Sequence, residues 1–230
     1  MNIHTIILAG GKGTRMLSQK AKVLQALGGR TMLNHVLTTA NKISNKISVV
    51  VGFDKEGVEE EIKKIGINAN TYLQREQIGT ADAVKTTLKD IDKNEKILIL
   101  YGDVPLIKEE TLKKLCNQES DLSILTTNLE NPTGYGRALK DKENNVLGII
   151  EEKDADLEQK KIKEIFTGIL VTKGGVLKNF IPEIDNNNSA KEFYLTDLIG
   201  IANSNGFKIC LLYTSPSPRD VEESPMPSSA

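Results

Sequence analysis

Short apolar runs alternate with amphipathic stretches along the first half of the chain. The apolar runs are rich in β-branched residues and occupy residues 6–8, 47–51, 71–73, 96–100 and 122–127. Between them, apolar residues recur at helical spacing in residues 32–40, 55–65, 80–88 and 108–115. The first pattern predicts buried strands, and the second predicts helices that bury one face. This alternation predicts an α/β fold with a mixed, mostly parallel sheet flanked by helices.

The second half of the chain follows the same alternation less regularly. Apolar runs predict further strands at residues 146–150, 168–171 and 207–212. Helices are predicted at residues 157–165, 176–181 and 193–202. The stretch 157–165 is highly charged, which is typical of a solvated face.

The composition changes at the C-terminal end. Four of the seven prolines, with several serines, fall in residues 213–230, where no apolar periodicity remains. Such a segment cannot bury enough apolar surface to order itself. Residues 210–220 also look like the read-through translation of a sequencing adapter. We therefore predict one domain in residues 1–209 and a disordered, non-native tail in residues 210–230.

A glycine-rich loop follows the first predicted strand. Gly10, Gly11 and Gly13 allow backbone N–H groups to lie open and a ligand to approach the main chain closely, which suits phosphate binding. Lys12, Arg15 and Lys22 follow and supply positive charge. The spacing fits neither a Walker A loop nor the dinucleotide fingerprint. A tight turn with scattered surface lysines is the alternative interpretation.

An aspartate follows the predicted strand at residues 96–100. In a parallel sheet the carboxyl end of this strand lies at the same edge as the glycine loop, so Asp103 should face that loop. Because Mg²⁺ is usually held by one or two carboxylates plus substrate phosphates, Asp103 is a candidate magnesium ligand. The alternative is a local turn bond before Pro105.

Charge and cysteine content limit the function classes. The 30 basic and 31 acidic residues give no general attraction to nucleic acid or to anionic membranes. Cys116 and Cys210 are far apart, with no metal-type spacing, and fit free thiols in a reducing compartment. No segment approaches the length of a membrane span or a signal peptide core. We therefore expect a cytoplasmic protein that binds neither nucleic acid nor membrane.

The glycine loop belongs to a longer motif. Residues 8–16, Leu-Ala-Gly-Gly-x-Gly-Thr-Arg-Met, followed by Lys22, resemble the signature of sugar-phosphate nucleotidyltransferases, and most of all bacterial N-acetylglucosamine-1-phosphate uridylyltransferases. Residues 74–81, 101–106, 132–137 and 148–154 match the same family in order. The resemblance covers residues 3–208. It implies a Rossmann-like, GT-A-like nucleotidyltransferase fold, the pyrophosphorylase domain of a bifunctional uridylyltransferase/acetyltransferase.

The resemblance also implies an activity and a site. The reaction is Mg²⁺-dependent transfer of a uridylyl group from UTP to N-acetylglucosamine 1-phosphate, giving pyrophosphate and UDP-N-acetylglucosamine, a peptidoglycan precursor. Arg15, Lys22 and Asp103 are the implied catalytic residues, and Asp103 is also the implied Mg²⁺ ligand. The implied substrate-binding residues are Leu8, Ala9, Gly10, Gly11, Gln74, Gly79, Thr80, Tyr101, Gly102, Gly136 and Glu151. Among these, Gly136 and Glu151 would face the sugar.

The chain departs from the family in three places. Ala21 replaces a proline before Lys22, and Phe166 replaces a sugar-facing asparagine, a loss that typically costs ~1–3 kcal/mol. The family's second metal ligand and its C-terminal left-handed β-helix domain lie beyond the native-looking sequence, so we expect no acetyltransferase function and leave the oligomeric state open. Two alternatives remain: a catalytically impaired nucleotide-sugar binding module, and a related transferase for another sugar phosphate.

Overall fold

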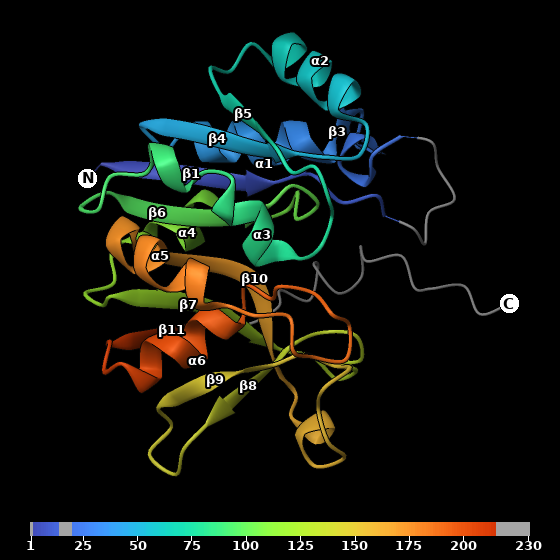
Figure 1. Cartoon of the computed structure of the whole chain (residues 1–230). Helices are drawn as coiled ribbons and strands as arrows, with labels where there is room; N and C mark the ends of the chain where they lie inside the picture. The colour runs from blue at the N-terminus through green and yellow to red at the C-terminus, as the bar shows by residue number, and fades with distance from the viewer. Residues whose placement is uncertain (1, 14–19, 215–230) are drawn as a thin grey trace, which may run out of the picture.

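A single large sheet organises the molecule. The computed structural model describes residues 2–13 and 20–214. Its main sheet has nine strands, seven of them in the order β11-β7-β10-β6-β1-β4-β5 (Figure 1). Along this path β10 is antiparallel to both of its neighbours, whereas the other neighbouring pairs are parallel. The predicted α/β class, with a mixed and mostly parallel sheet, is confirmed.

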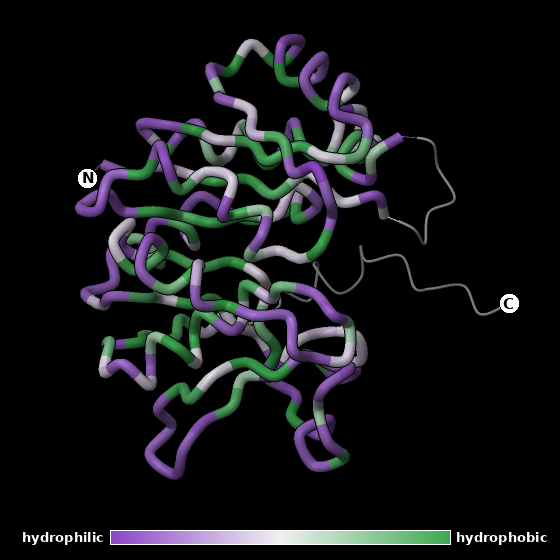
Figure 2. Tube along the Cα trace, in the orientation of Figure 1, coloured by the Kyte–Doolittle hydropathy of each residue, from purple (hydrophilic) through white to green (hydrophobic). Residues whose placement is uncertain are grey.

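The central strands of the main sheet are buried, as the apolar runs predicted, whereas the edge strand at residues 70–73 is mostly exposed and the edge strand at residues 209–213 is partly buried. They are β1 (Ile3–Leu8), β4 (Lys46–Val51), β5 (Asn70–Leu73), β6 (Lys96–Tyr101), β7 (Leu122–Asn128), β8 (Arg137–Lys140), β9 (Val146–Ile150), β10 (Glu164–Lys173) and β11 (Ile209–Tyr213). A small two-stranded sheet joins β2 (Ala26–Leu27) to β3 (Arg30–Thr31). In Figure 2 the central strands are mostly green, and the turn between β8 and β9 is purple. The sheet is therefore the apolar centre of the fold.

Helices cover both faces of the sheet. The helices α1 (Met32–Asn41), α2 (Lys55–Ile65) and α4 (Glu109–Cys116) contribute buried residues to one apolar cluster. The other cluster contains residues of α3 (Thr80–Lys85), α5 (Gly174–Phe180) and α6 (Asp197–Ser204). Alternate residues of β1 supply both clusters, Ile6 to one and Ile7 to the other, because successive side chains of a strand point to opposite faces.

Three sequence predictions are corrected here. Residues 157–165 form no α-helix: only a 3-10 turn, η4 (Gln159–Lys161), occurs before β10 begins. The predicted helix at residues 193–202 starts four residues later, at α6. Residues 209–213 form β11, paired in parallel with β7, so the ordered chain passes the expected domain limit at residue 209. The rest of the expected tail, residues 215–230, lies outside the described residues.

No helix formed by residues 2–13 and 20–214 has the length and apolar character that crossing a bilayer requires.

Candidate active site

The ends of β1 and β6 meet at the carboxyl edge of the sheet. The two strands pair in parallel, with Leu8 opposite Tyr101. The Gly102 N–H then donates to the Leu8 carbonyl at 2.9 Å. A side chain at Gly102 would have its Cβ 2.9 Å from Val23 Cγ1, so a glycine is required for this close approach. The glycine loop after β1 and the Asp103 loop after β6 therefore lie side by side, as predicted.

An ion pair joins these two loops. Lys22 Nζ donates to Asp103 Oδ2 at 2.7 Å, and the two side chains are 41% and 29% exposed. The Lys22 stem packs on Gly13, where an added Cβ would lie 2.8 Å from Lys22 Cβ and where φ is +62°. Gly13 is thus needed both for its backbone conformation and for the room it leaves to Lys22.

A cavity of about 560 Å³ opens at this edge, within the size range of ligand pockets. Ten of the predicted site residues line it: Leu8, Ala9, Gly10, Gly11, Lys22, Gln74, Gly79, Thr80, Tyr101 and Asp103. Gly102, Gly136 and Glu151 do not line it. Arg15 lies outside the described residues.

Gln74, one of the implied substrate-binding residues, has a structural position. Its side chain is buried, and Nε2 donates to the Gly79 carbonyl at 2.9 Å and to Asp82 Oδ2 at 3.0 Å. A Cβ built on Gly10 would lie 3.2 Å from Gln74 Oε1. Gln74 therefore holds the turn at Gly79 against the glycine loop, and its amide nitrogen is already engaged.

A segment from a distant part of the chain fixes the turn at Gly79. Residues 192–196, which we call the strap, run past this turn. Phe193 N donates to Ile78 O at 2.8 Å, and Ala81 N donates to Phe193 O at 2.9 Å. Leu195 N donates to Thr80 Oγ1 at 3.0 Å. Gly79 has φ +136°, and a Cβ there would lie 2.3 Å from Phe193 O, so this position requires glycine.

The strap also reaches the predicted sugar-facing carboxylate. Thr196 Oγ1 donates to Glu151 Oε1 at 2.9 Å. A Cβ on Gly136 would lie 3.4 Å from Glu151 Oε2, which places these two predicted residues next to each other. The strap therefore connects the Gly79 turn at one end to Glu151 at the other.

Burial and like charge determine the electrostatics around Glu151. Burial raises the pKa of the Glu151 carboxyl, the hydrogen bond from Thr196 opposes this rise, and the carboxylates of Asp154 and Glu192 add to it. The pKa of Asp197 is raised to about 6, first by burial and then by the charge of Glu151. Both carboxyls are therefore harder to ionise than exposed ones, because burial and neighbouring negative charge disfavour the charged form.

Tyr101 lies between the two ends of the site. Burial raises the pKa of its phenol, a hydrogen bond with Thr80 opposes the rise, and the charges of Glu151 and Asp103 add to it. Its ring packs against Gly168, where a Cβ would come within 2.7 Å of Tyr101 Cε2. The uncharged Tyr101 side chain thus lies between the two ends of the site, near the carboxylates of Glu151 and Asp103.

The described residues fit a magnesium ion that a substrate helps to hold. They contain no group of three or more His, Cys, Asp or Glu side chains arranged around a metal. Asp103 nevertheless presents a partly exposed carboxylate to the cavity beside Lys22. Because Mg²⁺ keeps several waters and binds through one or two carboxylates plus substrate phosphates, this single carboxylate is compatible with it.

Two polar residues of the cavity were not predicted as site residues. Gln77 lines the cavity and lies within residues 74–81, one of the segments that resemble the family, so that resemblance could have indicated it. Glu192 belongs to the strap and reaches the cavity only through long-range packing. Lys12, Gly13, Val23 and Ala83 complete the lining. No local pattern could have placed Glu192 opposite the glycine loop.

A loop with open N–H groups, a lysine and a carboxylate, at the carboxyl edge of a helix-covered sheet, defines the class as a nucleotide-binding α/β domain. The model of the MobA-like NTP transferase domain matches residues 5–155. The chain therefore belongs to the MobA-like NTP transferase domain family, and it is a nucleotidyltransferase. The predicted resemblance to nucleotidyltransferases is confirmed.

Two relatives refine this assignment. The chain is 44% identical over 207 residues to the bifunctional protein GlmU of Ruthia magnifica subsp. Calyptogena magnifica, which confirms the more specific resemblance. That match takes in 89% of this chain but 45% of the relative, so the chain spans less than half of that protein. A structure from Bacillus anthracis, described as a glucose-1-phosphate thymidylyltransferase, matches with a TM-score of 0.72 and 20% identity. The structural alignment covers 94% of this chain and 87% of the Bacillus anthracis chain. At this level of identity, the likeness supports the fold alone.

Proposed function

We propose that this chain transfers a uridylyl group from UTP to N-acetylglucosamine 1-phosphate. A phosphate oxygen of the sugar phosphate attacks the α-phosphorus of UTP. The bond between that phosphorus and the oxygen bridging to the β-phosphate breaks, and pyrophosphate leaves with the electron pair. One phosphoanhydride bond is broken and one is formed, so the task of the protein is to align two anions and to offset their charge.

The observation that supports this proposal is the Lys22–Asp103 pair. It joins the phosphate-type loop after β1 to the carboxylate after β6 at 2.7 Å, inside the cavity. A cation and a metal-type ligand side by side are the charges that a magnesium-bound triphosphate needs. A merely tight turn would need neither of them.

The remaining residues lie at two ends of the site, one that binds the nucleotide and one that binds the sugar. At the nucleotide end, the main chain of Gly10 and Gly11, which line the cavity, offers N–H donors to the phosphates. Gln74 and the strap hold the Gly79 turn in the shape that receives the base. At the sugar end, Glu151 accepts hydrogen bonds from sugar hydroxyls. Magnesium held by Asp103 would supply positive charge to the phosphates.

Phe166 favours a second candidate function, a nucleotide-sugar binding module with impaired turnover. Its N–H donates to the Gly136 carbonyl at 2.9 Å, so the residue adjoins the sugar end, and its ring is 5% exposed. A buried phenyl ring offers no hydrogen bond to a sugar where the family has an amide. A related transferase for another sugar phosphate is the third candidate.

Release of pyrophosphate on mixing the chain with UTP, Mg²⁺ and N-acetylglucosamine 1-phosphate is the direct test. Turnover with this pair, and slower turnover with other nucleotides and sugar phosphates, is the expected result. Binding of UTP without turnover would support the binding module, and faster turnover with another sugar phosphate would support the related transferase. Phe166→Asn should lower the KM for the sugar phosphate roughly tenfold, whereas the control Phe166→Leu should not.

A further inference from the structure

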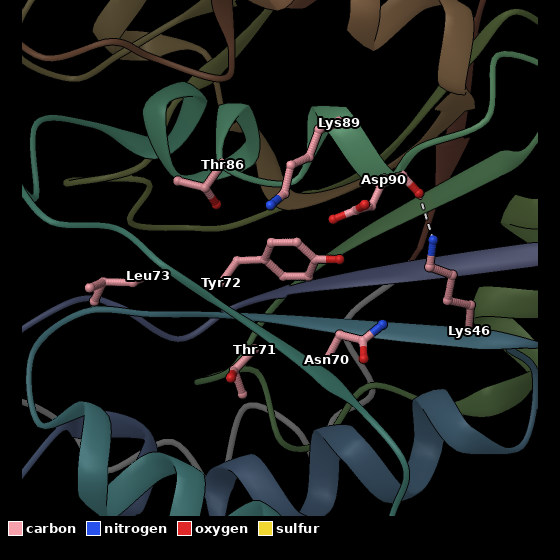
Figure 3. Close-up of a pocket in the computed structure, with 8 residues that line it drawn as sticks. All are labelled: Lys46, Asn70, Thr71, Tyr72, Leu73, Thr86, Lys89 and Asp90. Atoms are coloured by element: carbon pink, nitrogen blue, oxygen red, sulfur yellow. Dashed lines mark hydrogen bonds between the residues drawn. The ribbon is translucent and has the colours of Figure 1, made fainter.

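The two ends of β4 make different long-range contacts. At its amino end, Lys46 borders a cavity of about 660 Å³ beside β5, and its ammonium donates to the Asp90 carbonyl at 2.6 Å (Figure 3). Neither residue lines the cavity of the candidate active site. At its carboxyl end, β4 runs into residues 52–54, which we call the β4–α2 turn and which contact the glycine loop. The carboxyl end is therefore the one that can act on the candidate active site.

The β4–α2 turn holds two parts of the wall of the active-site cavity. Phe53 N donates to the Gly10 carbonyl at 3.0 Å. Ala21 N donates to Asp54 Oδ2, also at 3.0 Å. Gly10 lines the cavity, and so does Lys22, the residue that follows Ala21. The turn therefore contacts the glycine loop through its main chain and the segment before Lys22 through a carboxylate.

Asp54 has a conformation that its own helix does not require. It is the N-cap residue of α2, a position where an aspartate ordinarily accepts from a backbone N–H of the first turn. Its side chain makes no such capping bond, and its backbone lies in the left-handed region, with φ +54° and ψ +44°. This region is unfavourable for residues with a side chain. Such strain persists where surrounding contacts hold it, and the contact that Asp54 makes is with Ala21.

The hydrogen bond between Ala21 and Asp54 is packed from both sides. Ala21 is fully buried, so its N–H would lose a hydrogen bond that water could not replace if the carboxylate moved away. The other carboxylate oxygen, Asp54 Oδ1, lies against α2, where a Cβ built on Gly57 would be only 2.5 Å from it. Gly57 thus leaves the room that the carboxylate occupies.

Ala21 in turn fixes the start of the short helix that carries Lys22. It is the N-cap residue of the 3-10 helix η2 (Lys22–Leu24). Leu24 N donates to the Ala21 carbonyl at 2.9 Å, and Gln25 N donates to the Lys22 carbonyl at 3.0 Å. From this helix, Lys22 Nζ reaches Asp103 Oδ2 at 2.7 Å. A bond that holds the Ala21 N–H therefore holds the base of the Lys22 side chain.

From these contacts we infer that Asp54 is a positioning residue for Lys22. Asp54 does not line the cavity, and it acts through the hydrogen bond that it accepts from Ala21. The inference rests on the proposed function for the role of Lys22 toward the phosphates, and on the contacts above for the geometry. Because a misplacement of about 1 Å can reduce a rate roughly 10²-fold, a residue outside the cavity can control turnover.

Two substitutions of Asp54 test this role in the full chain. Asp54→Gly removes the acceptor and suits the left-handed backbone, whereas Asp54→Asn keeps an acceptor oxygen and tolerates that backbone. The kcat for pyrophosphate release should fall about tenfold or more in Asp54→Gly and stay within about twofold in Asp54→Asn. The KM for N-acetylglucosamine 1-phosphate should change less than about twofold in both. The matched control is Asn144→Gly, an exposed residue with φ +65°, which should leave kcat unchanged.

Two further variants separate positioning from folding. Gly57→Ala places a Cβ where Asp54 Oδ1 lies, so the carboxylate must rotate away from Ala21. It should lower kcat about as much as Asp54→Gly with little change in Tm, because the gain in helix propensity offsets the lost hydrogen bond. In a Lys22→Gln chain, Asp54→Gly should reduce kcat by less than about twofold more, since both changes act on the same group. Fully additive losses would overturn the inference.

Hydrogen exchange measured by NMR without substrate tests the positioning independently of turnover. The amides of Ala21, Leu24 and Gln25 should exchange about tenfold or more faster in Asp54→Gly than in the unsubstituted chain, and remain protected in Asp54→Asn. Unchanged exchange or unchanged kcat in Asp54→Gly overturns the inference, and so do equal losses in Asp54→Gly and Asp54→Asn. If the unsubstituted chain releases no pyrophosphate, the proposed function fails, and the exchange rates still decide whether Asp54 holds the helix of Lys22.

Discussion

The two ends of the candidate site differ in the chemical groups that form them. The nucleotide end consists of main chain, glycines and one ion pair at the ends of parallel strands. The proposed sugar end consists of partly buried carboxyl groups on and near the antiparallel β8–β9 pair, held by the strap. The first depends on local backbone geometry, and the second depends on packing between distant segments. The comparison teaches that binding at the two ends should be separable by mutation.

The largest effect is expected at the nucleotide end, from Asp103→Asn. The change keeps the shape of the side chain but removes the charge beside Lys22, so turnover should fall roughly 10²–10³-fold. The unfolding free energy should change by less than about 1 kcal/mol, because the ion pair is partly exposed. Steady-state pyrophosphate release and urea unfolding measure the two quantities. A variant with an unchanged rate would remove Asp103 from the mechanism.

Gly79→Ala should come next, since it acts where the strap joins the two ends. The new Cβ would meet the backbone of Phe193 at a φ of +136°, so a loss of about 3 kcal/mol in unfolding free energy is expected. Gly11→Ala is the matched control, because nothing lies within 4 Å of its Cβ. Chemical denaturation of both variants gives the comparison. Equal unfolding free energies for the two variants would mean that the strap can move away from residue 79 at no measurable cost in stability.

Glu151→Gln should affect the sugar end alone. Replacing a charged acceptor by an amide costs about 2 kcal/mol, which corresponds to a roughly thirtyfold higher KM for the sugar phosphate. The KM for UTP should stay within about twofold. The exposed Glu158→Gln is the control and should leave both constants unchanged. If both KM values rose together in Glu151→Gln, the two ends would not be separable.

The same division explains what could be predicted from the sequence. The parallel half of the sheet, the glycine loop and Asp103 were predicted from apolar runs, glycines and strand-end positions, which are local signals, and most of the ten cavity residues were implied by the family resemblance. The helix predicted at residues 157–165 was wrong: these residues are good helix formers, but Leu157 is 80% exposed, and Ile165 of β10 pairs with Thr127 of β7. Pairing across the sheet overrides helix propensity at that place.

Long-range packing also limited the prediction of the site. The strap resembles the start of a helix in sequence, yet its backbone N–H and carbonyl groups are used by Ile78, Thr80 and Ala81. Glu192 enters the cavity only because of those bonds. At the C-terminal end, the composition of the tail predicted disorder from residue 210, but Cys210 and Leu211 pair with Ser123 and Ile124 of β7. A neighbouring strand is a partner that composition alone does not reveal.

The smallest expected effect concerns stability at the sugar end. The pKa of Asp197 is about 6 in the folded chain, above its ordinary value of 3.8. Between these values the folded state binds more protons than the unfolded state, so this carboxyl makes stability fall as the pH rises from about 4 to 6. Asp197→Asn should therefore raise the Tm at pH 7.5 by about 2–4 °C and leave it unchanged at pH 4. Thermal unfolding at the two pH values measures this.

A second carboxyl, Asp121, whose pKa is shifted in the opposite direction, sharpens that test. Hydrogen bonds from Lys173 and from the Lys208 backbone lower the pKa of Asp121. Its contribution is present above its ordinary pKa and is lost as the pH falls through the lowered value. Asp121→Asn should therefore lower the Tm at pH 7.5, where Asp197→Asn raises it. If both variants shifted the Tm in the same direction, amide substitution itself, and not the ionisation of a buried carboxyl at the sugar end, would be the cause.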